Sequence, residues 1–172
     1  MRPLILLFLL LPVCSPATDS PIGLADLIKE ALSVAPEIKP GQVVILSSES
    51  ALLPYLRSWG YSRAVASQTL QEVRSLAEFT IDHHFPIFVN ASSIHVQRIV
   101  RSWTHGAFPG QAARVMASDL YHEYLHAQYA AGECAALEGQ LNLLTRWRDQ
   151  GILTIAAPYI ATKQSALLKE CQ

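Results

Sequence analysis

The chain has 172 residues, of which 51% are hydrophobic and 16% are charged, and its formal net charge is −1. This length suits one domain and is short for two. The abundance of apolar residues argues against a disordered protein, and the balanced charge argues against a basic nucleic-acid-binding protein. We therefore expect a globular protein without a polyanionic partner.

The first segment has the outline of a secretory signal peptide. Arg2 precedes an apolar run over 4–12, and the small residues Ser15 and Ala17 follow it. The run has about half of the roughly 20 apolar residues that a membrane-spanning helix needs. We predict that residues 1–17 are removed, which leaves 18–172 as a single domain without a stable membrane span. The protein is then secreted, or held in the periplasm or cell envelope.

The cysteines fit the same compartment. A lipid anchor at Cys14 is less favoured, because Val13 stands where such a motif requires a small residue. Loss of the signal peptide leaves Cys134 and Cys171, and an exported protein can join two cysteines in a disulfide. A disulfide and two buried free thiols both remain open.

Hydrophobic periodicity and turn residues predict an α+β protein that is mainly helical and has a small sheet. Between two strands, His83 and His84 alternate in direction and cannot both face one metal ion, so we interpret them as part of a turn. The predicted elements are a helix at 21–35, a strand at 42–46, helices at 51–59 and 63–76, strands at 78–82 and 86–90, a helix-compatible segment at 92–103, a loop at 104–110, and helices at 111–131 and 133–147.

One segment carries a chemical pattern, His122-Glu123-Tyr124-Leu125-His126, within the helix predicted at 111–131. Residues four apart share a helix face, so both imidazoles can bind one zinc ion. Glu123 lies one step around the helix, where it can accept a proton from a water molecule that the metal activates. The pattern predicts two metal ligands and a general base.

The third ligand must follow the motif. The metzincin pattern is excluded, because Tyr129 and Gly132 stand where it requires Gly and His. Glu133 and Glu138 are the nearby carboxylates. If Gly132 ends the helix in a left-handed conformation, Glu138 in the next antiparallel helix lies level with His126, whereas Glu133 lies roughly 8 Å above it. This geometry favours Glu138 and leaves Glu133 as the alternative.

The motif and the glutamate on the next helix resemble the gluzincin group of zinc metallopeptidases, which has small secreted single-domain members. The resemblance implies a zincin-like fold and favours Glu133, because the family often carries its glutamate in an E-x-x-A setting, here Glu133-Cys134-Ala135-Ala136. It also implies a substrate-binding strand before the motif helix, for which 86–90 is the candidate. The family stabilises the oxyanion with a downstream His or Tyr, here Tyr159, and His105 is an upstream rival.

Asp119 lies one turn before His122 and is a candidate to orient a ligand imidazole through a hydrogen bond. Together the sequence predicts a secreted metallopeptidase with one zinc ion and a peptide or protein substrate. The alternative is an exported zinc-binding protein whose metal is structural or whose peptidase site is degenerate and inactive. The oligomeric state is not predicted.

Overall fold

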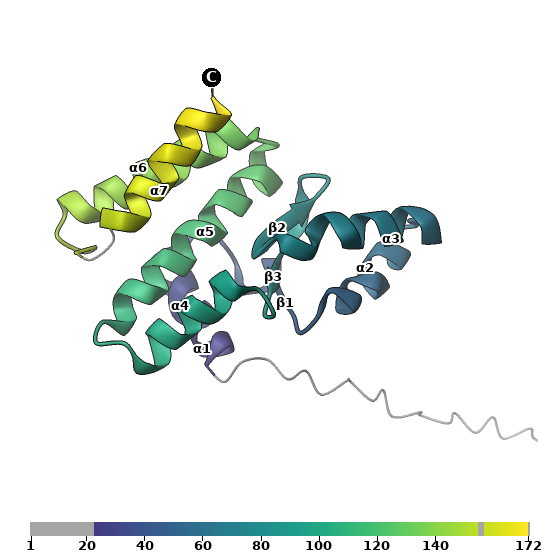
Figure 1. Cartoon of the computed structure of the whole chain (residues 1–172), viewed down its shortest axis with the longest axis horizontal. Helices are drawn as coiled ribbons and strands as arrows, with labels where there is room; N and C mark the ends of the chain where they lie inside the picture. Colours follow the sequence, from purple (N-terminus) through teal and green to yellow (C-terminus); the bar gives the residue numbers. More distant parts are fainter. Residues whose placement is uncertain (1–22, 155–156, 172) are drawn as a thin grey trace, which may run out of the picture.

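The computed structural model describes residues 23–154 and 157–171 (Figure 1). The predicted signal peptide, with Cys14, lies outside these residues. The described residues form a mainly helical α+β structure with a small mixed sheet and three short 3-10 turns. The elements are α1 Leu24–Val34, β1 Val43–Leu46, α2 Leu53–Ser58, α3 Arg63–Glu72, β2 Glu78–Ile81, β3 His84–Asn90, α4 Ile94–His105, α5 Pro109–Tyr129, α6 Glu133–Asp149 and α7 Ala157–Glu170.

Local signals explain where several helices begin. Ser62 accepts a hydrogen bond from the backbone N–H of Val65 and caps α3, and Ser93 caps α4 in the same way. Pro109 occupies the first turn of α5, where its missing N–H has no intrahelical partner to lose. The predicted loop at 104–110 is therefore too long, since α4 extends through the first of these residues and α5 already includes the last.

The sheet has the strand order β1-β3-β2. β3 pairs with β1 in parallel and with β2 in antiparallel orientation, and Asp82 and His83 form the turn between β2 and β3. The backbone of β3 is thus paired on both sides. The expectation that the strand at 86–90 binds an extended substrate is wrong, because a strand needs a free edge for that role. The edge strands of the sheet are β1 and β2, and β2 is the edge strand that contacts α5.

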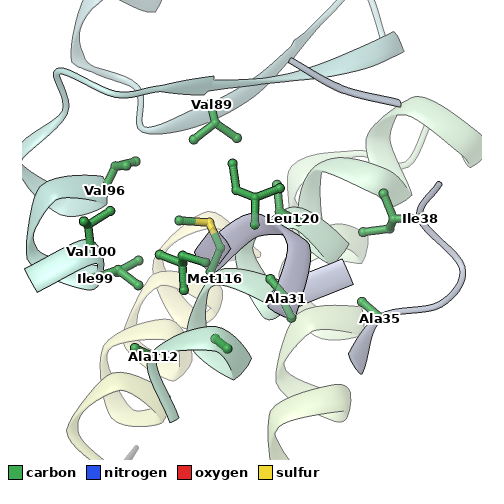
Figure 2. Packing of buried hydrophobic residues seen from close by; sticks show 14 of the residues in the cluster. Ala31, Ala35, Ile38, Val89, Val96, Ile99, Val100, Ala112, Met116 and Leu120 are labelled. Carbon is green, nitrogen blue, oxygen red and sulfur yellow. The ribbon is translucent and has the colours of Figure 1, made fainter. Parts of the chain in front are cut away.

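The apolar core occupies both faces of the sheet. Ile87 and Val89 of β3 pack into a cluster with α1, α4 and α5, part of which Figure 2 shows around Met116 and Leu120. Phe88 points to the other face and packs with residues of α2 and α3. The alternation along β3 places every second side chain on the same face. The helices on both sides hold the sheet, and β2 with it, against the motif helix α5.

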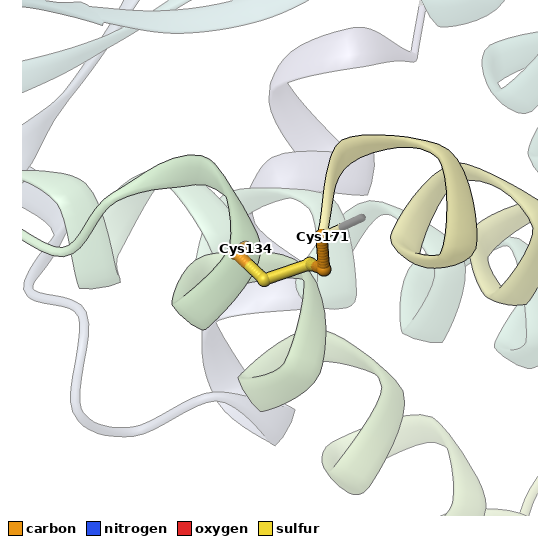
Figure 3. The surroundings of a disulfide bond; sticks show 2 residues. All are labelled: Cys134 and Cys171. Atoms are coloured by element: carbon orange, nitrogen blue, oxygen red, sulfur yellow. A yellow bond between two sulfur atoms is a disulfide. The ribbon is translucent and has the colours of Figure 1, made fainter.

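The last three helices, α5, α6 and α7, lie side by side (Figure 1). A disulfide joins Cys134, in the first turn of α6, to Cys171, directly after α7 (Figure 3). This resolves the open question about the two cysteines and is consistent with a protein outside the cytoplasm. No helix among the described residues combines the length and the apolar character that crossing a membrane requires.

Candidate metal centre

The two motif histidines lie on one face of α5, as their spacing predicts. The exposed fraction of each side chain is 10%, and their Nε2 atoms are 3.1 Å apart. His122, Glu123 and His126 form a group that could hold a metal ion, because their ligand atoms all lie within 4.8 Å of one another. The group faces β2 across a cavity of about 470 Å³, whose lining includes Glu78, Thr80 and these three residues.

The carboxylate of Glu133 lies beside both imidazoles, with one oxygen near each of them. Its Oε1 lies 3.4 Å from Nε2 of His122, and its Oε2 lies 3.2 Å from Nε2 of His126. Ligand atoms about 2.0–2.1 Å from a tetrahedral zinc ion are separated by about 3.3–3.4 Å. The 3.1 Å between the two Nε2 atoms, and the 3.4 and 3.2 Å from these atoms to one Glu133 oxygen each, are close to that spacing, so the two imidazoles and this carboxylate fit a divalent metal ion.

The second ring nitrogen of His126 supports the same interpretation. Nδ1 of His126 lies 2.7 Å from the carbonyl oxygen of Ala131, which can only accept, so Nδ1 carries the proton and Nε2 keeps a free electron pair. Nδ1 of His122 is buried and has no hydrogen-bond partner among the described residues. Burial lowers the pKa of His122 to about 4, against the opposing effect of the Glu133 carboxylate. His122 is therefore neutral near pH 7, which metal binding requires.

Glu123 lies beside the histidines and in contact with the sheet. Oγ1 of Thr80 donates a 3.5 Å hydrogen bond to its Oε2, and its Oε1 is 4.0 Å from Nε2 of His122. Burial raises the pKa of Glu123 to about 8, and the carboxylates of Glu133 and Asp119 act in the same direction. A nearby divalent cation would offset these effects and favour the ionised form. Glu123 thus has the position and the tunable pKa of a general base.

Glu138 lies level with His126 only if the motif helix continues to Gly132, but the helix ends before that residue. α5 ends at Tyr129, and Ala130 rather than Gly132 takes the left-handed conformation, with φ 49°. The early turn brings Glu133 level with His126, while Glu138 lies on the exposed side of α6. The expectation that Gly132 is left-handed is therefore wrong, since its φ is −70° and it precedes α6 as the N-cap.

The register of the helical hairpin agrees with this placement. Gln140 of α6 donates a 2.8 Å hydrogen bond to Oδ1 of Asp119 on α5. Seven residues along α5 from Asp119 is His126, and seven residues back along α6 from Gln140 is Glu133. Seven residues are about two helical turns, so both pairs obey one antiparallel register. α6 therefore packs antiparallel against the motif helix α5, as the sequence predicts for the next helix.

Asp119 is the centre of a second polar network. Its Oδ2 lies 3.0 Å from Nε2 of His95, and its Oδ1 accepts from Gln140, from the Tyr159 hydroxyl and, at 3.1 Å, from Nζ of Lys163. Burial alone would raise the pKa of Asp119, but Lys163 and His95 hold it well below its usual value. No hydrogen bond joins it to His122 or His126 within the described part of the chain. Its predicted role as an orienting partner of a ligand imidazole stays a prediction.

Tyr159 and His105 were the two candidates for oxyanion stabilisation. The hydroxyl of Tyr159 donates to Asp119 and accepts from Gln140, and its ring lines a cavity of about 560 Å³ together with His122 and Glu123. Burial, with Asp119, raises the pKa of this hydroxyl well above its usual value. His105 ends α4, bonds Thr104, and is not among the residues that line either cavity beside the motif.

Glu78, His95 and Asp119 form a second group whose ligand atoms lie within 4.8 Å of one another. Oε1 of Glu78 is buried without a hydrogen-bond partner among the described residues, and burial, with Asp119 and Glu123, raises its pKa well above the usual value. Lys163 already supplies a positive charge 3.1 Å from Asp119. We assign no second metal ion here, because an ammonium group occupies the position of the cation.

Three residues at the site were not predicted to belong to it: Thr80 and Lys163, which the sequence gives no reason to single out, and His83, which it predicts only as part of a turn. Each comes from an element far from the motif in sequence, so helical spacing carries no signal for them. His83 is the one with a usable signal, since an imidazole in a short turn is unusual where Gly or Asn is preferred. Its ring centroid lies 5.6 Å from that of His126.

No protein-family model matches this chain, and no curated protein and no solved structure is significantly similar to it.

Proposed function

We propose that the protein is a secreted zinc-dependent metallopeptidase that hydrolyses peptide bonds, with His122, His126 and Glu133 as ligands of one zinc ion and Glu123 as general base. The observation that carries this proposal is that the two Nε2 atoms lie 3.1 Å apart and each lies 3.2 or 3.4 Å from one oxygen of the Glu133 carboxylate, beside the Glu123 side chain, which is 13% exposed. Two imidazoles and a carboxylate are a known ligand set of catalytic zinc. The order of these residues along the chain also resembles the gluzincin peptidases.

Glu123, Thr80 and His122 have different roles in the proposed hydrolysis. A zinc ion bound here would supply a Lewis acid that lowers the pKa of water toward neutrality. Glu123 accepts a proton at its carboxylate from the water that attacks the carbonyl carbon, and it can return that proton to the leaving amine. Thr80 orients the Glu123 carboxylate through its hydroxyl. The neutral imidazole of His122 keeps its electron pair for the metal.

The strand β2, which lines the site, is suited to bind an extended peptide. β2 has a free edge, because it pairs only with β3 among the described strands, and Glu78 and Thr80 of this strand line the cavity at the motif. A peptide can add to such an edge through main-chain hydrogen bonds. We therefore propose a peptide or protein substrate that lies along β2, with its scissile bond at His122 and His126.

The geometry favours a catalytic metal over the alternative of a structural one. Structural zinc sites are closed by four protein ligands, whereas catalytic sites leave a position for water or substrate. Here the side chain of Glu133 is 53% exposed, and His122, His126 and Glu133 all line the cavity of about 470 Å³. An accessible site with a buried base beside it fits hydrolysis better than a purely structural role.

The decisive experiment is the variant Glu123→Gln in the mature protein with its disulfide formed. We expect it to bind zinc at the same stoichiometry as wild type, since Glu123 is not a ligand, and to lose at least about 100-fold in the rate of casein or peptide-library cleavage. Metal content is measured by elemental analysis and cleavage by mass spectrometry. Glu30→Gln, an exposed glutamate on α1, is the matched control and should behave as wild type.

The outcomes separate the two candidate functions. A wild-type protein that binds zinc tightly and cleaves no peptide in the library supports the structural or degenerate site. Activity retained in Glu123→Gln contradicts the assigned base. Failure of the wild type to bind zinc after incubation with the metal overturns both candidates.

A further inference from the structure

His83, in the turn between β2 and β3, lies beside the candidate metal centre. Ile81 pairs with His84, so the turn contains only Asp82 and His83. Both residues have left-handed backbone conformations, with φ 52° and 57°. Two-residue turns of this kind prefer Asn or Asp at the first position and Gly at the second, because both positions have positive φ. Asp82 is thus usual at its position, whereas His83 stands where Gly is preferred.

The turn is also anchored. The hydroxyl of Tyr61, in the connection between α2 and α3, donates a hydrogen bond to Oδ2 of Asp82. On the other side of the turn, the His83 ring lies next to that of His126, with an interplanar angle of 47° and a centroid separation of 5.6 Å. His83 lines the cavity of about 470 Å³ together with His122 and Glu123. The anchor and the strained backbone hold the imidazole at the His126 end of this cavity.

The other donors around the site are already engaged. The Thr80 hydroxyl donates to Glu123, and both Tyr159 and Lys163 donate to Asp119. The side chain of His83 makes no hydrogen bond to any residue that the structure describes. Glu123 and His83 lie toward different ends of the histidine pair, because Glu123 lies near His122 and the His83 ring lies next to that of His126. The cavity thus has a basic carboxylate at one end and a free imidazole at the other.

We propose that His83 is a catalytic residue that donates a hydrogen bond to the carbonyl oxygen of the scissile peptide as water attacks it. This inference rests on the proposed peptidase function. In the step, a bond forms between the water oxygen and the carbonyl carbon, and the π electrons of the carbonyl move onto its oxygen. Glu123 takes the proton of the water. The N–H of His83 contacts the developing oxyanion, and its proton stays on the ring.

The assignment differs from what the gluzincin resemblance implies, which is a His or Tyr downstream of the motif. Tyr159 is the downstream candidate, and its hydroxyl donates to the Asp119 carboxylate. An oxyanion would have to compete with that full negative charge for the same proton. His83 faces no such competitor within the described residues.

Two substitutions test the side chain without disturbing the turn. His83→Gly removes the imidazole and suits the left-handed conformation, and His83→Asn suits it as well while keeping an N–H donor. His84→Ala is the matched control, since His84 is the neighbouring exposed imidazole and lines a different cavity. Tyr159→Phe tests the downstream candidate. All four variants are made in the full mature chain loaded with zinc.

We expect His83→Gly to lower kcat about 100-fold with KM changed less than about threefold, because the lost hydrogen bond forms fully only in the transition state. The kcat of His83→Asn should be about tenfold higher than that of His83→Gly. The kcat of His84→Ala should stay within about twofold of wild type. Zinc stoichiometry should be unchanged throughout. A peptide phosphonamidate, which carries a tetrahedral oxyanion, should bind His83→Gly at least about tenfold more weakly by calorimetry.

Several outcomes overturn the inference. His83→Gly with the kcat of wild type rules out the donor role while leaving the peptidase function intact. Loss of zinc in His83→Gly makes His83 a ligand instead. A large loss in Tyr159→Phe with none in His83→Gly returns the role to Tyr159. If the wild type cleaves no peptide, the proposed function itself fails and the inference fails with it.

Discussion

At the scale of single residues, the candidate metal centre depends on the protonation of two imidazoles. The carbonyl of Ala131 holds the proton of His126 on Nδ1, and burial keeps His122 neutral near pH 7. Nε2 of His126 then has an electron pair available, 3.1 Å from Nε2 of His122. Outer hydrogen bonds of this kind fix the tautomer of a metal-binding histidine.

The third ligand is also a matter of single residues, and a pair of variants decides it. We expect Glu133→Ala to lower zinc affinity at least about 100-fold, because its carboxylate oxygens are 3.2 and 3.4 Å from the two Nε2 atoms. Glu138→Ala removes an exposed glutamate of the same helix and should leave the affinity unchanged. Competition with a chromophoric chelator measures both dissociation constants. A loss confined to Glu138→Ala contradicts the assignment.

At the scale of elements, α7 forms one wall of the site. Tyr159 and Lys163 of this helix both reach Asp119 on α5, and the disulfide fastens the chain after α7 to the first turn of α6. Cys134 is the residue directly after Glu133. The disulfide therefore restrains both α7 and the backbone that presents the proposed third ligand.

Removal of this disulfide should destabilise the protein. For a sequence separation of 37 residues, the loss of loop-closure restraint corresponds to about 3–4 kcal/mol in the free energy of unfolding. We expect Cys134→Ser with Cys171→Ser to lower the midpoint of urea unfolding accordingly, and zinc affinity to fall as well.

Reduced wild-type protein is the control for the serine substitutions and should match the double variant. An oxidised wild type that unfolds at the same urea concentration as the double variant contradicts this account of the disulfide.

At the scale of the whole molecule, the candidate metal centre lies where three parts of the structure meet: the edge of the sheet, the motif helix and the C-terminal helices. A metal ion that binds ligands on both α5 and α6 binds the folded state in preference to the unfolded one. Binding and stability are then linked.

We expect zinc at 100 times its dissociation constant to add about 2.7 kcal/mol to the free energy of unfolding, which raises Tm by about 5–10 °C for a chain of this size. Differential scanning calorimetry with and without excess zinc measures the shift. Glu133→Ala should show little of it at the same zinc concentration. An equal shift in that variant would mean that zinc stabilises the fold from another position.

Much of the local structure follows from short-range patterns. The periodicity of Val96, Ile99 and Val100 predicts a helix that buries one face, and the observed α4 buries these residues. The four-residue spacing of His122 and His126 places both imidazoles on one face of any helix that contains them. These inferences hold because they depend only on the backbone geometry of one element.

Other features depended on packing between elements. The left-handed residue after α5 is Ala130, although Gly132 is the residue that tolerates this conformation best. With this earlier turn, Glu133 rather than Glu138 lies beside the histidines. Likewise, only the pairing of β3 with both neighbours leaves β2 as the free edge beside the motif.

The sequence by itself determined the helical motif with its two histidines and glutamate, the α+β class and most of the helices and strands, because each follows from the spacing of residues close together in the chain. Only the tertiary structure decided which glutamate lies beside the two histidines and whether Cys134 and Cys171 form a disulfide. It also decided that His83 lies next to His126. Those contacts depend on the register between packed elements, and no short stretch of sequence encodes that register.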